Sequence, residues 1–259
     1  MIVSSIAADN IDWFLSMVSR DAVLHILTLY DLLYWRDRTE ISVALDDSSL
    51  LGYVLVFDGA HVHVRGEVCC VNALLGGVSV SEPSLVIEPH HLSAVGRFYT
   101  PIRPLDPESK GRITWFLGMT VDKDSFKPII RHDVRRLRKT DLDVVERSLG
   151  GELRRIADEA LKTGFSFAAY NRNFPASIGS VHLIGEYGFI RGFYTLPKFR
   201  GLGLATSVCS ALVEEALKAC ERCILWVARD NRAARRVYEK IGFRWTGHIL
   251  LGFKAKRIC

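Results

Sequence analysis

The residues with the clearest capacity for chemistry form a glycine-rich stretch, Ile190-Arg-Gly-Phe-Tyr-Thr-Leu-Pro-Lys-Phe-Arg-Gly-Leu-Gly-Leu-Ala-Thr206. Gly201 and Gly203 carry no Cβ, so the main chain can turn with positive φ or approach a ligand closely. The residues that follow would form a first helical turn, whose unpaired N–H groups and positive dipole end favour an anion. The stretch indicates a phosphate cradle, although an ordinary strand-to-helix connection has the same pattern.

The spacing of this stretch argues against two familiar nucleotide-binding loops. A Walker loop ends in Gly-Lys-Ser/Thr, whereas the chain reads Gly203-Leu-Ala-Thr206 and offers no lysine for a γ-phosphate. A Rossmann loop needs a third glycine three residues after Gly203, where Thr206 stands. The sequence therefore disfavours nucleoside triphosphates and dinucleotides as ligands.

A second motif follows at Asn231-Arg-Ala-Ala-Arg-Arg-Val-Tyr238-Glu-Lys-Ile-Gly242-Phe243. The step from Asn231 to Tyr238 is nearly two helical turns, so a group near the helix start and the tyrosine ring lie along one face. Both can then line one groove. Taken alone, Asn231 could be a plain helix cap and Tyr238 a packing aromatic.

Together the two motifs resemble the GCN5-related N-acetyltransferase (GNAT) superfamily. Its acyl-CoA signature is Arg or Gln, two residues, Gly, one residue, then Gly or Ala, and this chain has Arg200-Gly-Leu-Gly203-Leu-Ala205. The resemblance implies an α/β (α+β) acetyltransferase fold, with a mixed, mostly antiparallel central sheet flanked by helices. It also implies acyl transfer from acetyl-CoA as co-substrate to an amine, by direct attack and without a metal.

The resemblance assigns roles to individual residues. The backbone of the strand before the loop would pair with the pantetheine arm, and the loop amides would hold the pyrophosphate. The N–H of Thr195 would stabilise the oxyanion, and Tyr238 would protonate the departing thiolate. The implied coenzyme-binding residues are Phe193, Tyr194, Thr195, Arg200, Gly201, Leu202, Gly203, Leu204, Ala205, Thr206, Asn231 and Tyr238.

A general base is less evident. The nearest carboxylate on that strand is Glu186, which could act through a water chain or could be a turn residue. Family members that act on protein N-termini often carry a carboxylate five residues before the asparagine, and here that residue is Trp226. The acceptor therefore stays open between an amine-bearing small molecule and a peptide or protein.

The length of 259 residues, with 49% hydrophobic residues, suits two modules. Helical patterns at 7–34, strand patterns at 39–45, 51–57, 61–64 and 84–87, and short helical patterns at 69–75 and 89–95 approximate the acetyltransferase order without its glycine loop. We expect a degenerate acetyltransferase-like module at 1–125 and a coenzyme-binding module at 126–259. Pro101 to Pro107 is expected to be a connection, and Ile129 to Leu137 a strand.

Three weaker signals leave alternatives open. The net charge of +5 is concentrated in Arg131-His-Asp-Val-Arg-Arg-Leu-Arg-Lys139, which could bind nucleic acid, although a half-exposed strand with solvated charges is favoured. Cys220 and Cys223 have the spacing of a redox or zinc pair, but no second pair accompanies them, and we expect the six cysteines to be reduced thiols. His61 and His63 share a strand face without a third ligand.

The first twenty residues lack the apolar core of a signal peptide, and no apolar run is long enough to span a membrane. We therefore expect a cytoplasmic protein without a membrane partner. The sequence does not indicate an oligomeric state. A coenzyme A-binding regulatory protein without catalysis would keep the same loop and remains an alternative function.

Overall fold

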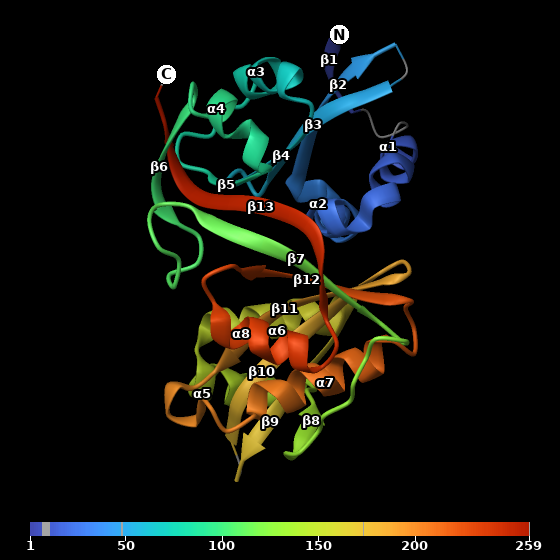
Figure 1. The fold of residues 1–259 in the computed structure, drawn as a ribbon, viewed down its shortest axis with the longest axis vertical. Helices are drawn as coiled ribbons and strands as arrows, with labels where there is room; N and C mark the ends of the chain where they lie inside the picture. Colours follow the sequence, from blue (N-terminus) through green and yellow to red (C-terminus); the bar gives the residue numbers. More distant parts are fainter. Residues whose placement is uncertain (7–10, 48, 173, 259) are drawn as a thin grey trace. The chain divides into compact units, whose positions relative to one another are not determined.

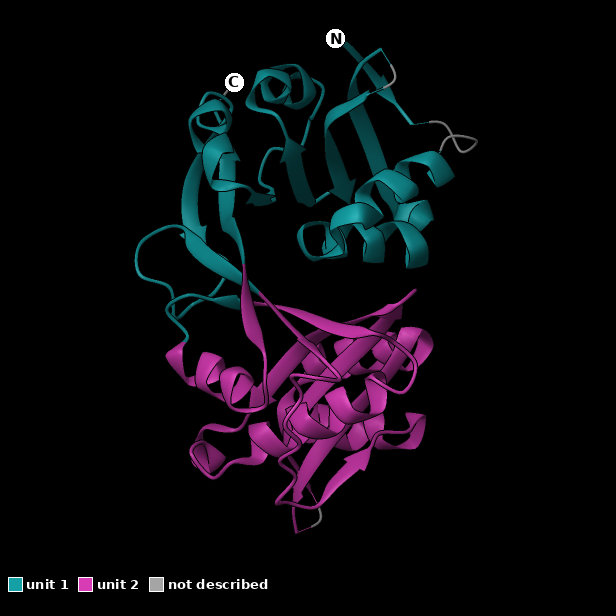
Figure 2. Cartoon of the chain, turned by 45° about the vertical axis from the view of Figure 1, so that its right-hand side comes forward, with its two compact units in different colours: residues 1–118, 227–231, 247–259 teal, residues 119–226, 232–246 magenta. Residues whose placement is uncertain are grey.

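The computed structural model describes residues 1–6, 11–47, 49–172 and 174–258. The chain divides into two compact units, coloured separately in Figure 2. Unit 1 comprises residues 1–118, 227–231 and 247–259, and unit 2 comprises 119–226 and 232–246. These units differ from the expected modules 1–125 and 126–259, because residues 251–257 pair with strands of unit 1 and so return the C-terminal segment to it.

Unit 1 begins with a short strand and two helices and continues as a strand meander (Figure 1). Its elements in chain order are β1 (Ile2–Ser5), α1 (Ile11–Val18), η2 (Ser19–Asp21), α2 (Ala22–Tyr34), η3 (Arg36–Arg38), β2 (Thr39–Asp46), β3 (Ser49–Phe57), β4 (His61–Gly66), α3 (Val68–Gly76), β5 (Ser84–Ile87), η4 (Pro89–His91), α4 (Leu92–Val95) and β6 (Tyr99–Pro104). The strands lie in the order β1-β2-β3-β4-β5-β13, and β6 pairs with β13 (Arg244–Arg257).

The two faces of the unit 1 sheet are covered by different helices. Val54 of β3 belongs to a buried apolar cluster with Leu74 and Leu75 of α3 and Phe253 of β13. The neighbouring Tyr53 points to the opposite face, where its hydroxyl lies 2.9 Å from the Thr28 hydroxyl of α2. The alternation along β3 is that of a strand buried on both sides. The helices predicted within 7–34 are confirmed, while residues 7–10 lie outside the described residues.

Unit 2, as far as its residues are described, is built around a second set of strands and four α-helices. Its elements are β8 (Val134–Arg136), η5 (Lys139–Asp141), α5 (Leu142–Leu149), α6 (Gly151–Thr163), β9 (Gly164–Asn171), β10 (Phe174–Ile184), β11 (Tyr187–Thr195), η6 (Pro197–Phe199), α7 (Leu204–Ala216) and α8 (Arg232–Lys240). Two further strands, β7 (Thr114–Asp122) and β12 (Arg222–Ala228), run from one unit into the other. The order β12-β11-β10-β9-β8 is antiparallel except for the parallel pair β11–β12.

Helices cover both faces of this second set of strands. Ile178 of β10 packs in a cluster with Val145 of α5 and Ala157 of α6. A Cβ on the next residue, Gly179, would contact Leu212 of α7, so α7 covers the other face. The predicted fold class, a mixed and mostly antiparallel sheet flanked by helices, is confirmed.

Two local expectations were wrong. The regular strand expected over Ile129 to Leu137 is confined to Val134–Arg136, because earlier N–H groups of that segment donate to serine side chains of α7. The connection expected from Pro101 to Pro107 begins within strand β6, whose prolines are compatible with a sheet edge. None of the helices among the described residues is long and apolar enough to cross a bilayer.

Candidate active site

Strand β11 has one hydrogen-bonding edge that its neighbour β12 covers only in part. It pairs with β10 from Ile184↔Tyr187 to Ser177↔Thr195. Its parallel pairing with β12, within the described residues, begins at Tyr187↔Arg222 and ends at Phe189↔Ile224. The second half of β11, which contains the predicted residues Phe193, Tyr194 and Thr195, therefore presents an open edge.

The orientation of the backbone groups on this edge follows from one hydrogen bond. The N–H of Leu196 donates to the Ala176 oxygen of β10 at 3.0 Å. Since backbone groups alternate sides along a strand, the N–H of Thr195 points away from β10. The Thr195 oxygen also points away, and it accepts from Nε of Arg200 at 3.2 Å. By the same alternation, Tyr194 offers its groups to β10, whereas the pairing is irregular at Gly192 and Phe193, between Ile178↔Tyr194 and Ser180↔Arg191.

The loop after β11 ends at an uncapped helix. Gly201 and Gly203 have φ of 80° and 87°, a region that glycine adopts without strain. Gly203 is the N-cap of α7 and no side chain caps the helix. Within the described part of the chain, no backbone N–H from Gly201 to Thr206 has a hydrogen-bond acceptor. This row of unpaired donors at a positive dipole end forms a ready anion site.

The segment 129–132, whose contact with the loop was not predicted, holds the start of α7 and the loop in place. The Ser207 hydroxyl accepts from the N–H of Arg131 at 3.0 Å, and the Ser210 hydroxyl accepts from the N–H of Ile129 at 2.7 Å. Nε2 of His132 lies 2.9 Å from the Leu202 oxygen. The signal available in the sequence was the pair of serines one helical turn apart on α7, which could have predicted a chain segment beside that turn.

Tyr238 lies on α8 and is 8% exposed. Its ring makes edge contacts with Phe193 and Phe243, with centroids 5.9 and 5.7 Å apart. Burial raises the pKa of the phenol above its ordinary value, so the hydroxyl keeps its proton at neutral pH. Asn231 directly precedes α8, and its backbone N–H donates to the Ala228 oxygen at 3.0 Å. The structure thus brings Tyr238 together with β11.

Glu186 is not brought to these residues. It is exposed in the two-residue turn between β10 and β11, and its backbone oxygen accepts from the N–H of Glu221 at 2.9 Å. The rest of β11 separates it from Thr195 by roughly 30 Å, at about 3.3 Å per residue. Trp226 lies on β12 beyond the last pair with β11, and its buried Nε1 has no acceptor among the described residues.

The remaining sequence signals are the basic run, the cysteine pair and the histidine pair. Arg135 pairs with Asp133, and Arg136 lies 3.7 Å from Glu215, so acidic neighbours offset part of the basic run. The run also borders an open groove of about 830 Å³. The described cysteines are free thiols, and Cys259 lies outside the described residues. Among the residues described, neither Cys220 with Cys223 nor His61 with His63 belongs to a set of three possible metal ligands.

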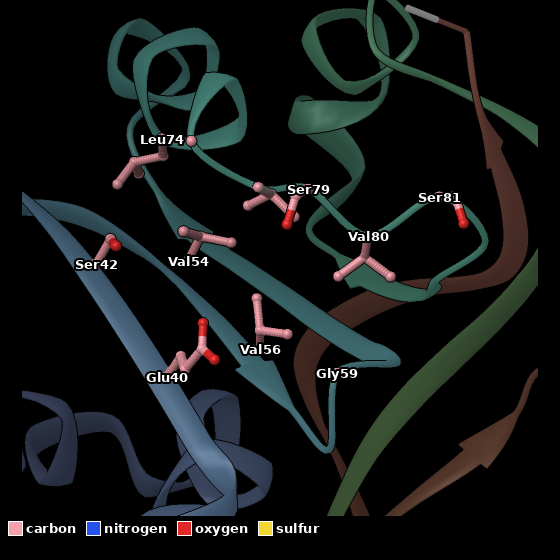
Figure 3. A pocket seen from close by; sticks show the side chains of 11 residues that line it. Glu40, Ser42, Val54, Val56, Gly59, Leu74, Ser79, Val80 and Ser81 are labelled. Atoms are coloured by element: carbon pink, nitrogen blue, oxygen red, sulfur yellow. The ribbon is translucent and has the colours of Figure 1, made fainter.

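Unit 1 has a pocket of about 370 Å³ that contains no predicted site residue. Figure 3 shows the side chains of Glu40 and Ser42 from β2 and of Val54 and Val56 from β3 on one side, with the segment 79–81 on the other. Its wall combines hydroxyl groups and one carboxylate with valine methyl groups.

The open strand edge and the donor-lined helix start lie within a segment that matches a known family. Residues 132–243 match the Acetyltransferase (GNAT) family, so the predicted resemblance to this superfamily is confirmed for the segment that holds both motifs. The uncharacterized N-acetyltransferase YobR of Bacillus subtilis is 35% identical over 78 residues, which are 30% of this chain and 32% of that protein. The match thus spans about a third of the length of this curated relative.

Solved structures extend the likeness of the fold to almost the whole chain. A Drosophila protein has a TM-score of 0.72 at 15% identity and covers 97% of this chain and 98% of its own. A GNAT-family acetyltransferase of Colwellia psychrerythraea has a TM-score of 0.62 at 13% identity, over 99% and 100%. A tandem GNAT protein of the clavulanic acid biosynthesis pathway has a TM-score of 0.58 at 13% identity, over 99% and 98%. At these identities the likeness concerns the fold.

Proposed function

We propose that the chain is an N-acyltransferase that moves an acetyl or other short acyl group from acyl-CoA to an amine, by direct attack in a ternary complex. The family match at 132–243 supports acyl transfer from acyl-CoA in general. The observation that carries the proposal is the row of unpaired N–H groups from Gly201 to Thr206, directly after the open half of β11. A donor row and an open strand edge suit the two polar parts of coenzyme A.

Each part of the coenzyme has a matching element. The donor row and the dipole of α7 bind the pyrophosphate. The open edge of β11, over Phe193 to Thr195, receives the amide-bearing pantetheine arm as an added strand would be received. Arg200, held to the Thr195 oxygen, joins the edge to the loop. Asn231, at the start of α8, contacts the pantetheine.

The chemistry requires orientation, charge stabilisation and a proton for the leaving group. The amine attacks the thioester carbonyl, and the N–H of Thr195 donates to the oxyanion that forms. Tyr238 donates its proton to the thiolate as the carbon–sulfur bond breaks. Its contact with Phe193 fixes the ring beside β11, and the proton transfer must occur while the thiolate forms, since burial raises the pKa of the phenol. Since Glu186 lies at the far end of β11, the amine gives up its own proton to solvent, and the Tyr238 phenolate takes a proton back from solvent.

The acceptor is an amine-bearing small molecule or a peptide. Calorimetry with coenzyme A and acetyl-CoA tests the first half of the proposal, and we expect one equivalent to bind per chain. A panel of amines with acetyl-CoA, followed by release of free thiol, tests the second half. Failure to bind coenzyme A at millimolar concentration would refute the proposal. Binding without thiol release from any amine would favour the alternative of a coenzyme-binding protein without catalysis.

A further inference from the structure

Three possible metal ligands of unit 1 meet at the end of β5. Glu88, His90 and His91 each offer one ligand atom, and these atoms all lie within 4.8 Å of one another. Glu88 directly follows β5, and both histidines belong to the turn η4, which begins at Pro89. The fixed φ of this proline favours one conformation of the turn. The local backbone therefore holds the three donors close together.

The backbone of Gly66, at the end of β4, orients all three side chains. Its N–H donates to Oε1 of Glu88 at 3.3 Å. Its oxygen lies 3.1 Å from Nε2 of His90 and 2.7 Å from Nε2 of His91. An imidazole that donates its Nε2–H to a carbonyl keeps the lone pair on Nδ1. A backbone carbonyl that orients metal-binding histidines in this way is common in metalloproteins.

One of the two rings has a nitrogen without a partner. His91 is 0% exposed, and its Nδ1 has no hydrogen bond within the described part of the chain. A buried polar atom without a partner is costly, and it calls for an explanation such as an ion. His90 is exposed and Glu88 is partly exposed, so an ion can reach the turn from solvent.

We propose that Glu88, His90 and His91 bind one divalent transition-metal ion of the zinc type through two imidazole nitrogens and one carboxylate oxygen. Imidazole donors select zinc, nickel or copper over magnesium and calcium, which prefer oxygen ligands. The positive charge of the nearby Arg65 acts on both His91 and Glu88 and opposes any bound cation, so the affinity must come from the coordinate bonds of the two imidazoles. Three protein ligands leave one tetrahedral position for water.

The test uses the full chain, prepared without a histidine tag and stripped of metal by a chelator. Zn²⁺ is titrated by calorimetry, and Co²⁺ is titrated by visible absorption. We expect one Zn²⁺ per chain with a dissociation constant below about 0.1 mM, and a rise in melting temperature with the ion bound. His90→Ala changes an exposed side chain and should lower the affinity at least about tenfold. Glu88→Gln should lower it as well.

The matched control is His61→Ala, an exposed histidine on β4 that does not belong to the cluster, and it should bind Zn²⁺ like the unchanged chain. A second control, Cys220→Ser with Cys223→Ser, should also leave binding intact. The proposal is overturned if the unchanged chain has no Zn²⁺ site with a dissociation constant below about 0.1 mM. It is also overturned if His90→Ala binds Zn²⁺ as tightly as the unchanged chain. Loss of binding in the cysteine variant, with a thiolate band in the Co²⁺ spectrum, would overturn it too.

Discussion

Each unit contains a strand that is followed by a helix and then by a second strand parallel to the first. These elements are β4, α3 and β5 in unit 1, and β11, α7 and β12 in the other set. The two sets differ in how far along the first strand the parallel pairing extends. In unit 1, β4 and β5 are paired from His61↔Ser84 to Val64↔Ile87, at the end of β5. In unit 2, β11 leaves β12 after Phe189↔Ile224 and continues to Thr195. The same succession of elements therefore gives a closed pair in one unit and an open edge in the other.

The glycines that precede the two helices, Gly66 before α3 and Gly203 before α7, also differ in their surroundings. Gly66 lies against β3, since a Cβ there would come within 2.2 Å of the Leu51 oxygen, and its own N–H and oxygen face Glu88, His90 and His91. Gly203 has only Nε2 of His132 near its Cβ position, at 3.4 Å, and the donors around it are unpaired. One glycine permits close packing within the protein and the other leaves room for a ligand. The degeneracy of the first module stays a prediction, and this difference supports it.

The largest expected effect comes from Gly203→Val. A branched side chain at φ of 87° is strained and would obstruct the approach of a pyrophosphate to the donor row. We expect coenzyme A affinity to fall by about 100-fold or more, measured by calorimetry on protein whose circular dichroism is unchanged. Gly76→Val, at the end of α3 where a Cβ meets nothing within 4 Å, is the matched control and should leave affinity unchanged. Equal affinity in both variants would remove the α7 loop from the site.

Gly66→Ala should lower the stability of the fold and leave coenzyme binding unchanged, the reverse of the effect expected for Gly203→Val. Its Cβ would lie 2.3 Å from the Cα of Gly52 at a φ of 105°, so both sterics and backbone conformation oppose it. We expect the free energy of unfolding to fall by about 3 kcal/mol or more, measured by urea denaturation. Coenzyme affinity of the remaining folded protein should stay close to that of the unchanged chain. A stable variant that no longer binds coenzyme A would contradict the contrast between the two glycines.

Tyr238→Phe keeps the ring contacts with Phe193 and Phe243 and removes only the proton donor. If the phenol protonates the leaving thiolate, the turnover number should fall by roughly 10- to 1000-fold, while coenzyme affinity stays near its original value. The measurement is thiol release with an amine found in the screen. Tyr187→Phe, at the other end of β11, is the matched control and should keep its turnover. Weaker coenzyme binding with unchanged turnover would make Tyr238 a packing residue.

The sequence predicted those parts of the site that depend on local patterns. Two glycines after an aromatic strand and an amphipathic run identified the loop and α7, and the spacing from Asn231 to Tyr238 identified α8. Such features depend on backbone conformation and helical periodicity within one segment. The structure confirms these elements, and their roles in binding and catalysis stay predictions.

Contacts between distant segments could not be predicted in the same way. The return of the C-terminal strand to unit 1 depends on pairing Leu251 with Ile87, and nothing in either segment specifies the other. The strand expected over Ile129 to Leu137 was too long because its first N–H groups are accepted by side chains of α7, far along the chain. Likewise, the approach of Glu88, His90 and His91 to Gly66 depends on the pairing of β4 with β5, which the sequence did not predict.

The smallest expected effect concerns His132, which belongs to the basic run and yet contacts the loop. Its Nε2 lies 2.9 Å from the Leu202 oxygen, one residue before Gly203, and the N–H of the preceding Arg131 donates to Ser207. This contact holds the loop whose donors are to face the pyrophosphate, so its loss should allow the loop to move before the coenzyme binds. One hydrogen bond of this kind contributes about 0.5–1.5 kcal/mol, so His132→Ala should weaken coenzyme A binding by roughly 2- to 10-fold.

Two comparison variants distinguish this role from a general effect of charge or folding. His132→Gln retains an N–H donor of suitable reach and should recover most of the affinity. Arg135→Gln removes a charge from the same run and should change the affinity little, because the Arg135 guanidinium pairs with Asp133 and has no hydrogen bond to the loop among the described residues. If His132→Ala and Arg135→Gln weaken binding equally, the basic run acts through its charge and not through the position of the loop. Unchanged affinity in His132→Ala would show that Gly201 and Gly203 hold their conformation without this hydrogen bond. The open edge and the unpaired donors would then depend on β11 and α7 alone.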